Sequence, residues 1–299
     1  MNKILLISDL HLRHDTPQGR IDNFKETMLK KLSFVLETAM NEEVDLILQA
    51  GDFFNKPDPP ISLLNELISV FKEFNIPIRA IYGQHDMYMR SDDIYKTAMG
   101  LFEQIGLIEL GTVIHNKTAI STVSFGAEVP NVQFKDKLNI LVIHAMIGNK
   151  PLYPGQELTD AGKFLKDNNY DIILAGDYHY PFHITREGRH IINTGCMLRM
   201  TRDERDMNRI PHFYILNVES RKLEKFNIPC ESPENVFSKI KEKQENETIM
   251  SEGELLRFIK QLRQRSKSGI SYLNVLEEYY EKNDIDEETK QLIAGVLNE

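Results

Sequence analysis

Aspartate and histidine side chains recur in short groups along the first 180 residues of this 299-residue sequence. The groups are Asp9 with His11, then Asp52, then Gln84-His85-Asp86, then His144, and finally Asp177 with His179. Mixed carboxylate and imidazole ligands suit divalent Mn, Fe or Zn better than Ca or Mg. A carboxylate shared by two ions would hold them ~3.5–4 Å apart, which is the arrangement for in-line displacement at phosphorus. A nearby histidine could protonate the leaving oxygen.

Each of these groups follows a short apolar run that is typical of a buried strand. We expect such strands over residues 4–8, 44–48, 77–82, 138–143 and 171–175. Helical spacing of apolar residues predicts helices over about 22–41, capped by Asp22, and about 62–74. A β-α-β-α-β order implies parallel strands whose carboxyl ends meet at one edge of the sheet. The polar groups should therefore converge in space, with Gly51 and Gly83 allowing tight turns before the ligand-type residues.

The rest of the chain divides into a β-rich middle and a charged, helix-like end. Further strands are expected over 118–125, 182–186, 189–193, 212–218 and 222–228, the last four antiparallel, with a helix over about 160–168. Composition shifts after Pro229, which predicts one domain over residues 1–229 and a helical C-terminal region over 230–299. Amphipathic helices are expected there over 236–243, 252–265, 272–282 and 287–297. This region would either pack on the main domain or dock a partner.

Composition places the chain among globular proteins, with 41% hydrophobic and 27% charged residues. No apolar run approaches the ~20 residues that a membrane span needs, and the N-terminus lacks a signal-peptide pattern. We therefore expect a cytoplasmic protein without a membrane partner, with Cys196 and Cys230 as free thiols. The net charge of −9 argues weakly against autonomous nucleic-acid binding. Cations in a carboxylate-rich site would offset part of that charge.

The order of the polar groups resembles a known family. Asp-x-His at 9–11, Gly-Asp at 51–52, Gly-Gln-His-Asp at 83–86, His144 and Gly-Asp-x-His at 176–179 resemble the motif series of calcineurin-like metallophosphoesterases, over residues 1 to about 228. More narrowly, the sequence resembles the SbcD-type nuclease subunit of the DNA double-strand-break repair complex, including divergent phage and bacterial members. That resemblance is carried by Arg20 with Asp22, by Gly51–Phe54 before a proline-rich loop, and by Asn193–Cys196 with Arg199 downstream.

The resemblance implies a fold and a set of residue roles. The fold class would be α/β, a four-layer α/β-β/α sandwich with a small helical C-terminal appendage. The first metal would be held by Asp9, His11, Asp52 and His179, and the second by Asp52 as bridge with Gln84, His144 and Asp177. His85 would be the catalytic acid, oriented by Asp86. Candidate phosphate or DNA contacts are His14, Asn55 and Arg199.

Two of the implied ligands depart from the family pattern, and both belong to the second metal. Gln84 stands where the family has Asn, one methylene shorter, and Asp177 stands where it has His. Both residues can still ligate through oxygen, which makes the second site harder and favours Mn²⁺ as the activating ion. Its occupancy therefore stays open. Cys196 also replaces a serine and loses a good hydrogen-bond donor.

The function implied is a Mn²⁺-dependent DNA exo- and endonuclease acting in repair, recombination or replication. It would work as a homodimer with an SMC-like ATPase of the SbcC type, docked on the C-terminal helices, in a bacterial or phage-infected cell. The tail is short, so the family's DNA-capping domain would be reduced or absent. One alternative is another binuclear phosphoesterase, such as a protein phosphatase or a cyclic-nucleotide phosphodiesterase. A second alternative is a non-catalytic module that has lost the second metal.

Overall fold

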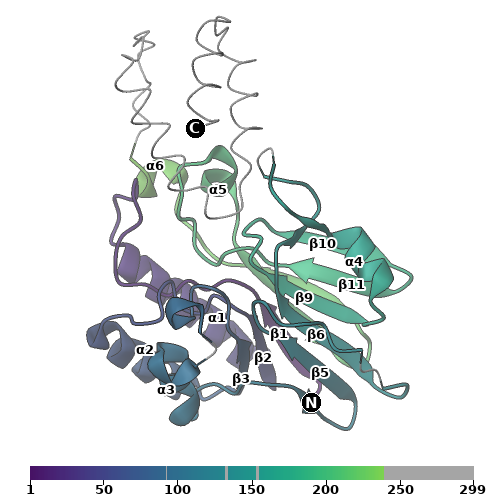
Figure 1. Ribbon diagram of the computed structural model, residues 1–299. Coiled ribbons are helices and arrows are strands. Elements are labelled where there is room, and N and C mark those ends of the chain that lie inside the picture. The colour runs from purple at the N-terminus through teal and green to yellow at the C-terminus, as the bar shows by residue number, and fades with distance from the viewer. Residues whose placement is uncertain (92, 132–133, 153–154, 239–299) are drawn as a thin grey trace, which may run out of the picture. The chain divides into compact units, whose positions relative to one another are not determined.

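The computed structural model describes residues 1–91, 93–131, 134–152 and 155–238 (Figure 1). Residues 1–149 and 159–238 of this set belong to one compact unit, which contains the fold and site below, whereas 150–152 and 155–158 belong to a second unit. The helices expected over 252–265, 272–282 and 287–297 lie outside the described residues, as does most of the one expected over 236–243. Val236 itself ends the short helix α6 (Pro233–Val236) rather than beginning a new one.

The first part of the chain forms the alternating strand and helix order that the sequence predicted. The elements are β1 (Lys3–Ile7), α1 (Phe24–Asn41), β2 (Leu46–Ala50), α2 (Ile61–Phe74) and β3 (Ile78–Ile81). The three strands pair in parallel, as expected. The predicted cap of α1 was wrong by one residue, because the Asn23 side chain accepts from the Glu26 N–H. Asp22 is instead engaged by Arg20 and Thr27.

Two antiparallel strands complete this first sheet. β12 (His212–Asn217) pairs with β1, and β13 (Leu223–Asn227) pairs with β12, which gives the order β13-β12-β1-β2-β3. The hairpin was predicted from its alternating pattern, within two residues at each end. β12 thus closes the chain back on its first strand, and the segment between β11 and β12 passes the edge where β1 ends.

A second sheet is built from the middle of the chain. Its order is β10 (Phe182–Arg186), β11 (Arg189–Asn193), β9 (Ile172–Gly176), β6 (Leu138–His144), β5 (Thr118–Val123) and β4 (Val113–Ile114). β10 and β11 are antiparallel, as predicted, but β11 also runs parallel to β9. β5, β6 and β9 are parallel as well. The carboxyl ends of β6 and β9 therefore lie at one edge of this sheet.

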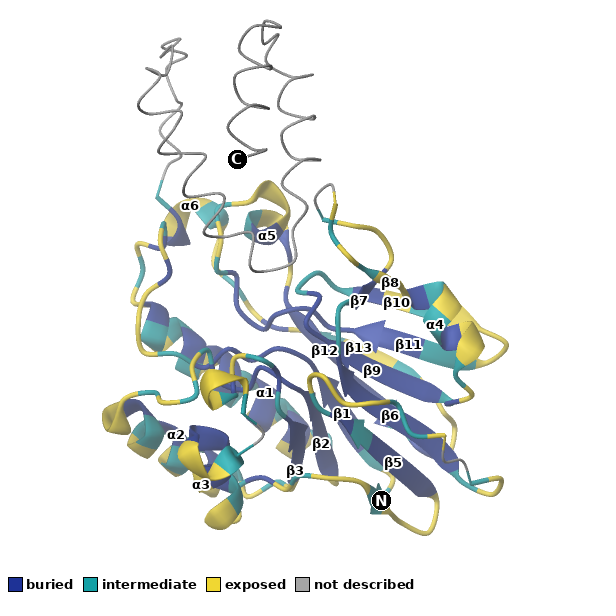
Figure 2. Cartoon of the chain, viewed as in Figure 1, coloured by how far each residue is buried: buried dark blue, intermediate teal, exposed yellow. Residues whose placement is uncertain are grey.

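Helices and sheets form four layers in this unit (Figure 1). The helices α1, α2 and α3 (Ala98–Gln104) share an apolar core with one face of the first sheet, and α3 was not predicted. A second core lies between the two sheets, and α4 (Ala161–Asp167) packs on β10 and β11. Figure 2 shows the central strands of both sheets almost wholly buried. The predicted four-layer α/β-β/α sandwich is confirmed.

The remaining short elements lie in the connections. They are β7 (Ile147–Gly148), β8 (Thr159–Asp160), α5 (Glu204–Asn208) and 3₁₀ turns over Tyr88–Arg90 and Ile94–Lys96. Both cysteines are free thiols, as expected. Among the helices that the structure describes, none is both long and apolar enough to cross a bilayer.

Candidate metal centre

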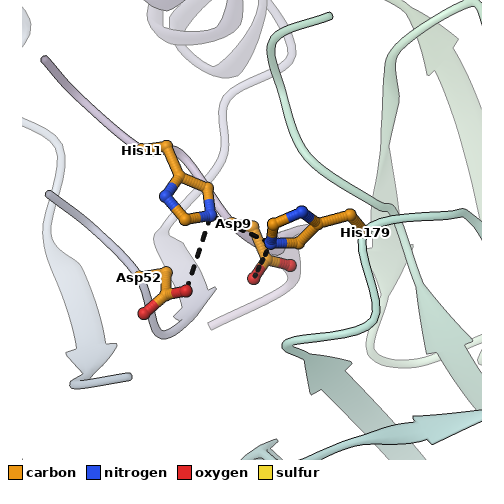
Figure 3. A group of neighbouring side chains, drawn as sticks. All are labelled: Asp9, His11, Asp52 and His179. Atoms are coloured by element: carbon orange, nitrogen blue, oxygen red, sulfur yellow. Dashed lines mark hydrogen bonds and ion pairs between the residues drawn. The ribbon is translucent and has the colours of Figure 1, made fainter. Parts of the chain in front are cut away.

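Four side chains from three loops meet at the strand ends, as Figure 3 shows. One ligand-type atom from each of Asp9, His11, Asp52 and His179 lies within 4.8 Å of the others. His11 Nε2 is 3.1 Å from His179 Nε2 and 3.5 Å from Asp52 Oδ2. Asp9 and His11 follow β1, Asp52 follows β2, and His179 follows β9. The structure therefore brings together the residues expected to hold the first metal.

The chemistry of these four side chains fits a divalent cation. Asp9 Oδ2 and Asp52 Oδ2 are buried and have no hydrogen-bond partner among the described residues. Burial raises the pKa of both carboxyls, and the nearby Asp9 charge raises the pKa of Asp52 further. Burial also lowers the pKa of His11 and His179, so both imidazoles are neutral ligands at neutral pH. A cation here would neutralise the carboxylates and engage the unpartnered oxygens.

The backbone at three of the seven expected ligand positions adopts the left-handed conformation. Its φ is +46° at His11, +49° at Asp52 and +82° at Asp177. Residues other than glycine rarely adopt this region, although His and Asp tolerate it better than most. Strained backbone of this kind persists where the surrounding structure fixes it, and it clusters at functional sites. Here it turns each side chain from its strand end into the site.

The residues expected around the second metal also converge, but they contact one another. His144 Nδ1 is 2.7 Å from the Ala50 carbonyl oxygen, which can only accept, so Nδ1 carries the proton. The other ring nitrogen, Nε2, lies 2.8 Å from Gln84 Oε1 and 3.6 Å from Asp52 Oδ1. Gln84 Nε2 donates to Asp177 Oδ1 at 2.8 Å. His144 Nε2 and Gln84 Oε1 are thus close enough to ligate one cation, whereas the Gln84 amide group already engages Asp177.

Two glycines make room for this half of the site in different ways. Gly51 has a φ of +84°, so it serves the tight turn that the sequence predicted. Gly83 also begins the predicted tight turn, which the Asp86 N–H closes by donating to the Gly83 carbonyl oxygen at 3.2 Å, but its own φ lies outside the left-handed region. A Cβ atom at Gly83 would lie 2.2 Å from Asp52 Oδ1 and 2.5 Å from His144 Nε2. Gly83 is therefore required by close approach of two ligand side chains.

His85 lies beside the metal ligands, but Asp86 does not orient it. The His85 Nδ1 atom is 3.0 Å from the main-chain carbonyl oxygen of Asn55. The Asp86 carboxylate instead accepts from the backbone N–H groups of Gly83, Phe53 and Phe54. Burial raises the pKa of Asp86 to about 7. The orienting role predicted for Asp86 is therefore corrected: it joins two ligand-bearing loops, and the Asn55 carbonyl orients His85.

The three candidate phosphate contacts do not share one location. His14 and Asn55 line a cavity of about 350 Å³ together with Arg13 and Lys56. Arg199 lies elsewhere, is only 4% exposed, and donates to the carbonyl oxygens of Met207 and Glu231. Its predicted contact role is corrected, because the guanidinium is buried in a structural network and does not line that cavity.

Several buried polar residues support the site and were not assigned a role from sequence. Ser8 Oγ donates to the Ala175 carbonyl, and the Ser8 N–H donates to Thr194 Oγ1 at 2.8 Å. Asn193 Nδ2 donates to the Tyr178 carbonyl at 2.7 Å. These bonds tie the end of β1 to the loop that carries His179. A buried polar residue directly before or after an apolar strand was the available signal.

Burial raises the pKa of Cys196 to about 12, so this residue stays a thiol.

A sequence model of the calcineurin-like phosphoesterase family matches residues 2–181, more than half of the chain. The DNA double-strand break repair protein Mre11 of Sulfolobus acidocaldarius is 26% identical over 198 residues, which are 59% of this chain and 49% of that protein. Mre11 of Aeropyrum pernix is 34% identical over 89 residues, 29% of this chain and 21% of that protein. In structure, TT1561 of Thermus thermophilus is 15% identical, with a TM-score of 0.49 over 76% of this chain and 99% of its own. The chain thus spans about half or less of the length of these two Mre11 proteins.

Proposed function

This chain belongs to the calcineurin-like phosphoesterase family, and we propose that it hydrolyses phosphodiester bonds in DNA with two divalent ions. The observation that carries this proposal is the convergence of two neutral imidazoles and two carboxylates, each carboxylate with an unpartnered buried oxygen. A set of carboxylate and imidazole donors of this kind binds transition-metal cations. DNA as substrate is supported by the similarity to proteins named for DNA double-strand break repair.

The side chains divide the work between them. Asp9, His11 and His179 would hold the first ion, and Gln84, His144 and Asp177 the second, with Asp52 shared. When bound, the ions supply charge neutralisation at the phosphate oxygens and an activated water. The chain's own hydrogen bonds fix the donors beforehand, because His144 is held by Ala50 and the Asp177 N–H donates to Asp9 Oδ1 at 3.0 Å.

His85 is suited to protonate the leaving oxygen. Its ring is exposed, and its centroid lies 5.0 Å from that of the buried His11 ring. The Asn55 carbonyl oxygen accepts a hydrogen bond from His85 Nδ1, so Nε2 is the ring nitrogen left to exchange a proton with the substrate. A positioned acid of this kind contributes about 10²–10⁴-fold to a rate.

The cavity beside Asn55 offers a place for the phosphates that flank the scissile bond. Its cationic side chains are Arg13 and Lys56, with His14 nearby. Arg13 is held by Asp15 and donates to Asn55 Oδ1 at 3.3 Å, so its position is fixed against the same residue that orients His85. Cations of this kind position a nucleic-acid backbone without reading its sequence.

The finer parts of the proposal rest on resemblance. They are Mn²⁺ as the activating ion, mixed exo- and endonuclease activity, a homodimer, and an SMC-like ATPase partner that docks on region 230–299. Residues 1–229 would then be the nuclease domain, acting in the cytoplasm. The similarity to Mre11 proteins supports these parts, and in the Sulfolobus acidocaldarius protein it extends over 198 residues.

The rival within the family is a phosphatase or a cyclic-nucleotide phosphodiesterase with the same ligands. The purified chain would be incubated with Mn²⁺ and offered single-stranded DNA, double-stranded DNA, a phosphopeptide and a cyclic nucleotide. We expect cleavage of DNA, absent in Asp52→Asn, which keeps the shape of the side chain. Hydrolysis of the phosphopeptide or cyclic nucleotide alone would replace the nuclease proposal with this rival.

A second rival is a non-catalytic module with a single metal. The hydrogen bond between Gln84 and Asp177 favours it, because it engages two of the second ion's ligands. The number of bound ions per chain distinguishes this single-metal module from the proposed two-metal enzyme. One ion per chain, unchanged in Asp177→Ala and accompanied by no hydrolysis, would support the module.

A further inference from the structure

A second group of ligand-type atoms lies on the hairpin of β10 and β11 (Figure 1), which begins three residues after His179. His183 Nε2 is 3.0 Å from His190 Nδ1. Thr185 Oγ1 is 3.1 Å from His190 Nδ1 and 3.4 Å from His183 Nε2. Three donor atoms of different residues therefore face one another.

The register of the hairpin produces this arrangement. Thr185 lies directly opposite His190, and His183 lies opposite Ile192. His183 and Thr185 are two residues apart in one strand, so they share a face of the sheet with His190. His183 is then the diagonal neighbour of His190, within reach of a ring side chain.

Aromatic packing holds the first of these rings in place. The His183 ring meets the Tyr214 ring at a centroid distance of 5.6 Å and an angle of 70°. Tyr214 belongs to β12 of the other sheet and packs on the buried His212 ring at 5.4 Å. The imidazole is therefore presented from a packed position rather than from a freely rotating surface side chain.

We propose that His183 Nε2 and His190 Nδ1 bind one divalent ion of the Zn²⁺, Ni²⁺ or Cu²⁺ class, with the Thr185 hydroxyl as third donor. Nitrogen ligands about 2.0–2.1 Å from a tetrahedral zinc lie roughly 3.3 Å apart, close to the spacing here. The exposed side of His183 leaves room for water to complete the coordination. This site is independent of the proposed nuclease function.

The environment suits metal binding and sets a preference. Burial lowers the pKa of both histidines, so a metal ion does not have to displace a proton from either ring at neutral pH. Imidazole ligands without a carboxylate favour Cu²⁺, Ni²⁺ and Zn²⁺ over Mn²⁺. The hairpin site should therefore bind Mn²⁺ poorly, whereas the carboxylate-rich strand-end site accepts it.

The test is a Cu²⁺ titration of the full chain, in which the wild type and the variants share the strand-end site and differ only at the hairpin. Ions are counted by equilibrium dialysis, and pulsed electron paramagnetic resonance reports nitrogen nuclei from bound imidazole. We expect an additional ion with two imidazole nitrogens in the wild type. His183→Ala and His190→Ala should each lose this ion and its two-nitrogen signature, while His115→Ala, at an exposed histidine, should keep both.

The two histidines could instead form only a hydrogen bond to each other. Equal copper content and equal nitrogen signals in the wild type, His183→Ala and His190→Ala would show this and overturn the proposal. Thermal unfolding without metal checks that His183→Ala folds, and His183→Gln serves as the second variant. The wild type should gain thermal stability from Zn²⁺, because a ligand that binds only the native state stabilises it. The variants should gain less than the wild type, because they keep only the strand-end site, and this difference does not depend on whether the wild type cleaves DNA.

Discussion

The two halves of the strand-end site are built from similar residues but differ in how well those residues are satisfied. The first half presents the buried His11 imidazole, the half-buried His179 imidazole and two carboxylates with unpartnered oxygens. In the second half, Gln84 contacts His144 on one side and Asp177 on the other. A cation entering the first half meets two carboxylate oxygens without hydrogen-bond partners and the His11–His179 contact, whereas one entering the second must displace the hydrogen bond from Gln84 to Asp177. We therefore infer that the first ion binds more tightly.

The largest effect is expected at Asp52, the side chain that both halves share. Asp52→Asn removes one negative charge next to each ion while keeping the volume of the buried side chain. We expect loss of bound metal and a fall in DNA hydrolysis of more than about 100-fold, beyond the usual effect of a supporting residue. Dialysis with metal analysis and a nuclease assay measure the two effects. Asp136→Asn, at an exposed loop position, is the matched control, and equal metal content in the two variants would argue against a shared ligand.

The next effect separates metal binding from proton transfer. His85→Ala should lower turnover by about 10²–10⁴-fold, because the leaving oxygen loses its proton donor. Metal content should stay at the wild-type level, since no metal role is assigned to this ring. Turnover close to wild type would refute the assignment of His85 as the acid.

A smaller effect is expected where the two halves approach each other. Gly83→Ala places a Cβ atom 2.2 Å from Asp52 Oδ1 and 2.5 Å from His144 Nε2, so these ligands must shift. We expect metal affinity to fall about 10–100-fold, as for other changes that misplace ligands. Gly162→Ala in α4 is the control, since the nearest atom to its added Cβ lies 3.4 Å away. If isothermal titration gave the same affinity for both variants, the close approach at Gly83 would not matter for binding.

The smallest effect is expected at Gln84, where a substitution should change the affinity of the second ion alone. Gln84→Asn shortens the side chain by one methylene, which breaks its hydrogen bond to Asp177 and frees both donors. We expect the second ion to bind more tightly, on the order of tenfold, with the first ion unchanged. Titration with Mn²⁺ gives both affinities, and a weaker second ion in Gln84→Asn would mean that the longer amide is the better ligand.

The convergence of the ligands was predictable because it follows from local patterns. Each ligand group comes directly after an apolar run, and parallel strands bring such ends to one edge. The same reasoning predicted the helices that cover the first sheet, but not the short helix α3. Its seven residues carry too little periodicity to stand out.

The sequence did not reveal hydrogen bonds between residues that lie far apart along the chain. Asp86 accepts hydrogen bonds from Phe53 and Phe54, more than thirty residues earlier. Arg199 donates to the carbonyl of Glu231, 32 residues later. Local spacing contains no information on such contacts, so a catalytic interpretation was assigned to residues that serve the fold.

Anomalous diffraction from crystals of the chain soaked in Mn²⁺ would test the metal centre most directly. We expect a strong peak within coordinating distance of Asp9, His11, Asp52 and His179. A weaker peak should lie beside Asp52, Gln84, His144 and Asp177, reflecting the lower occupancy of the second half. Absence of a peak at the first four residues would contradict the assignment of this site as a metal centre.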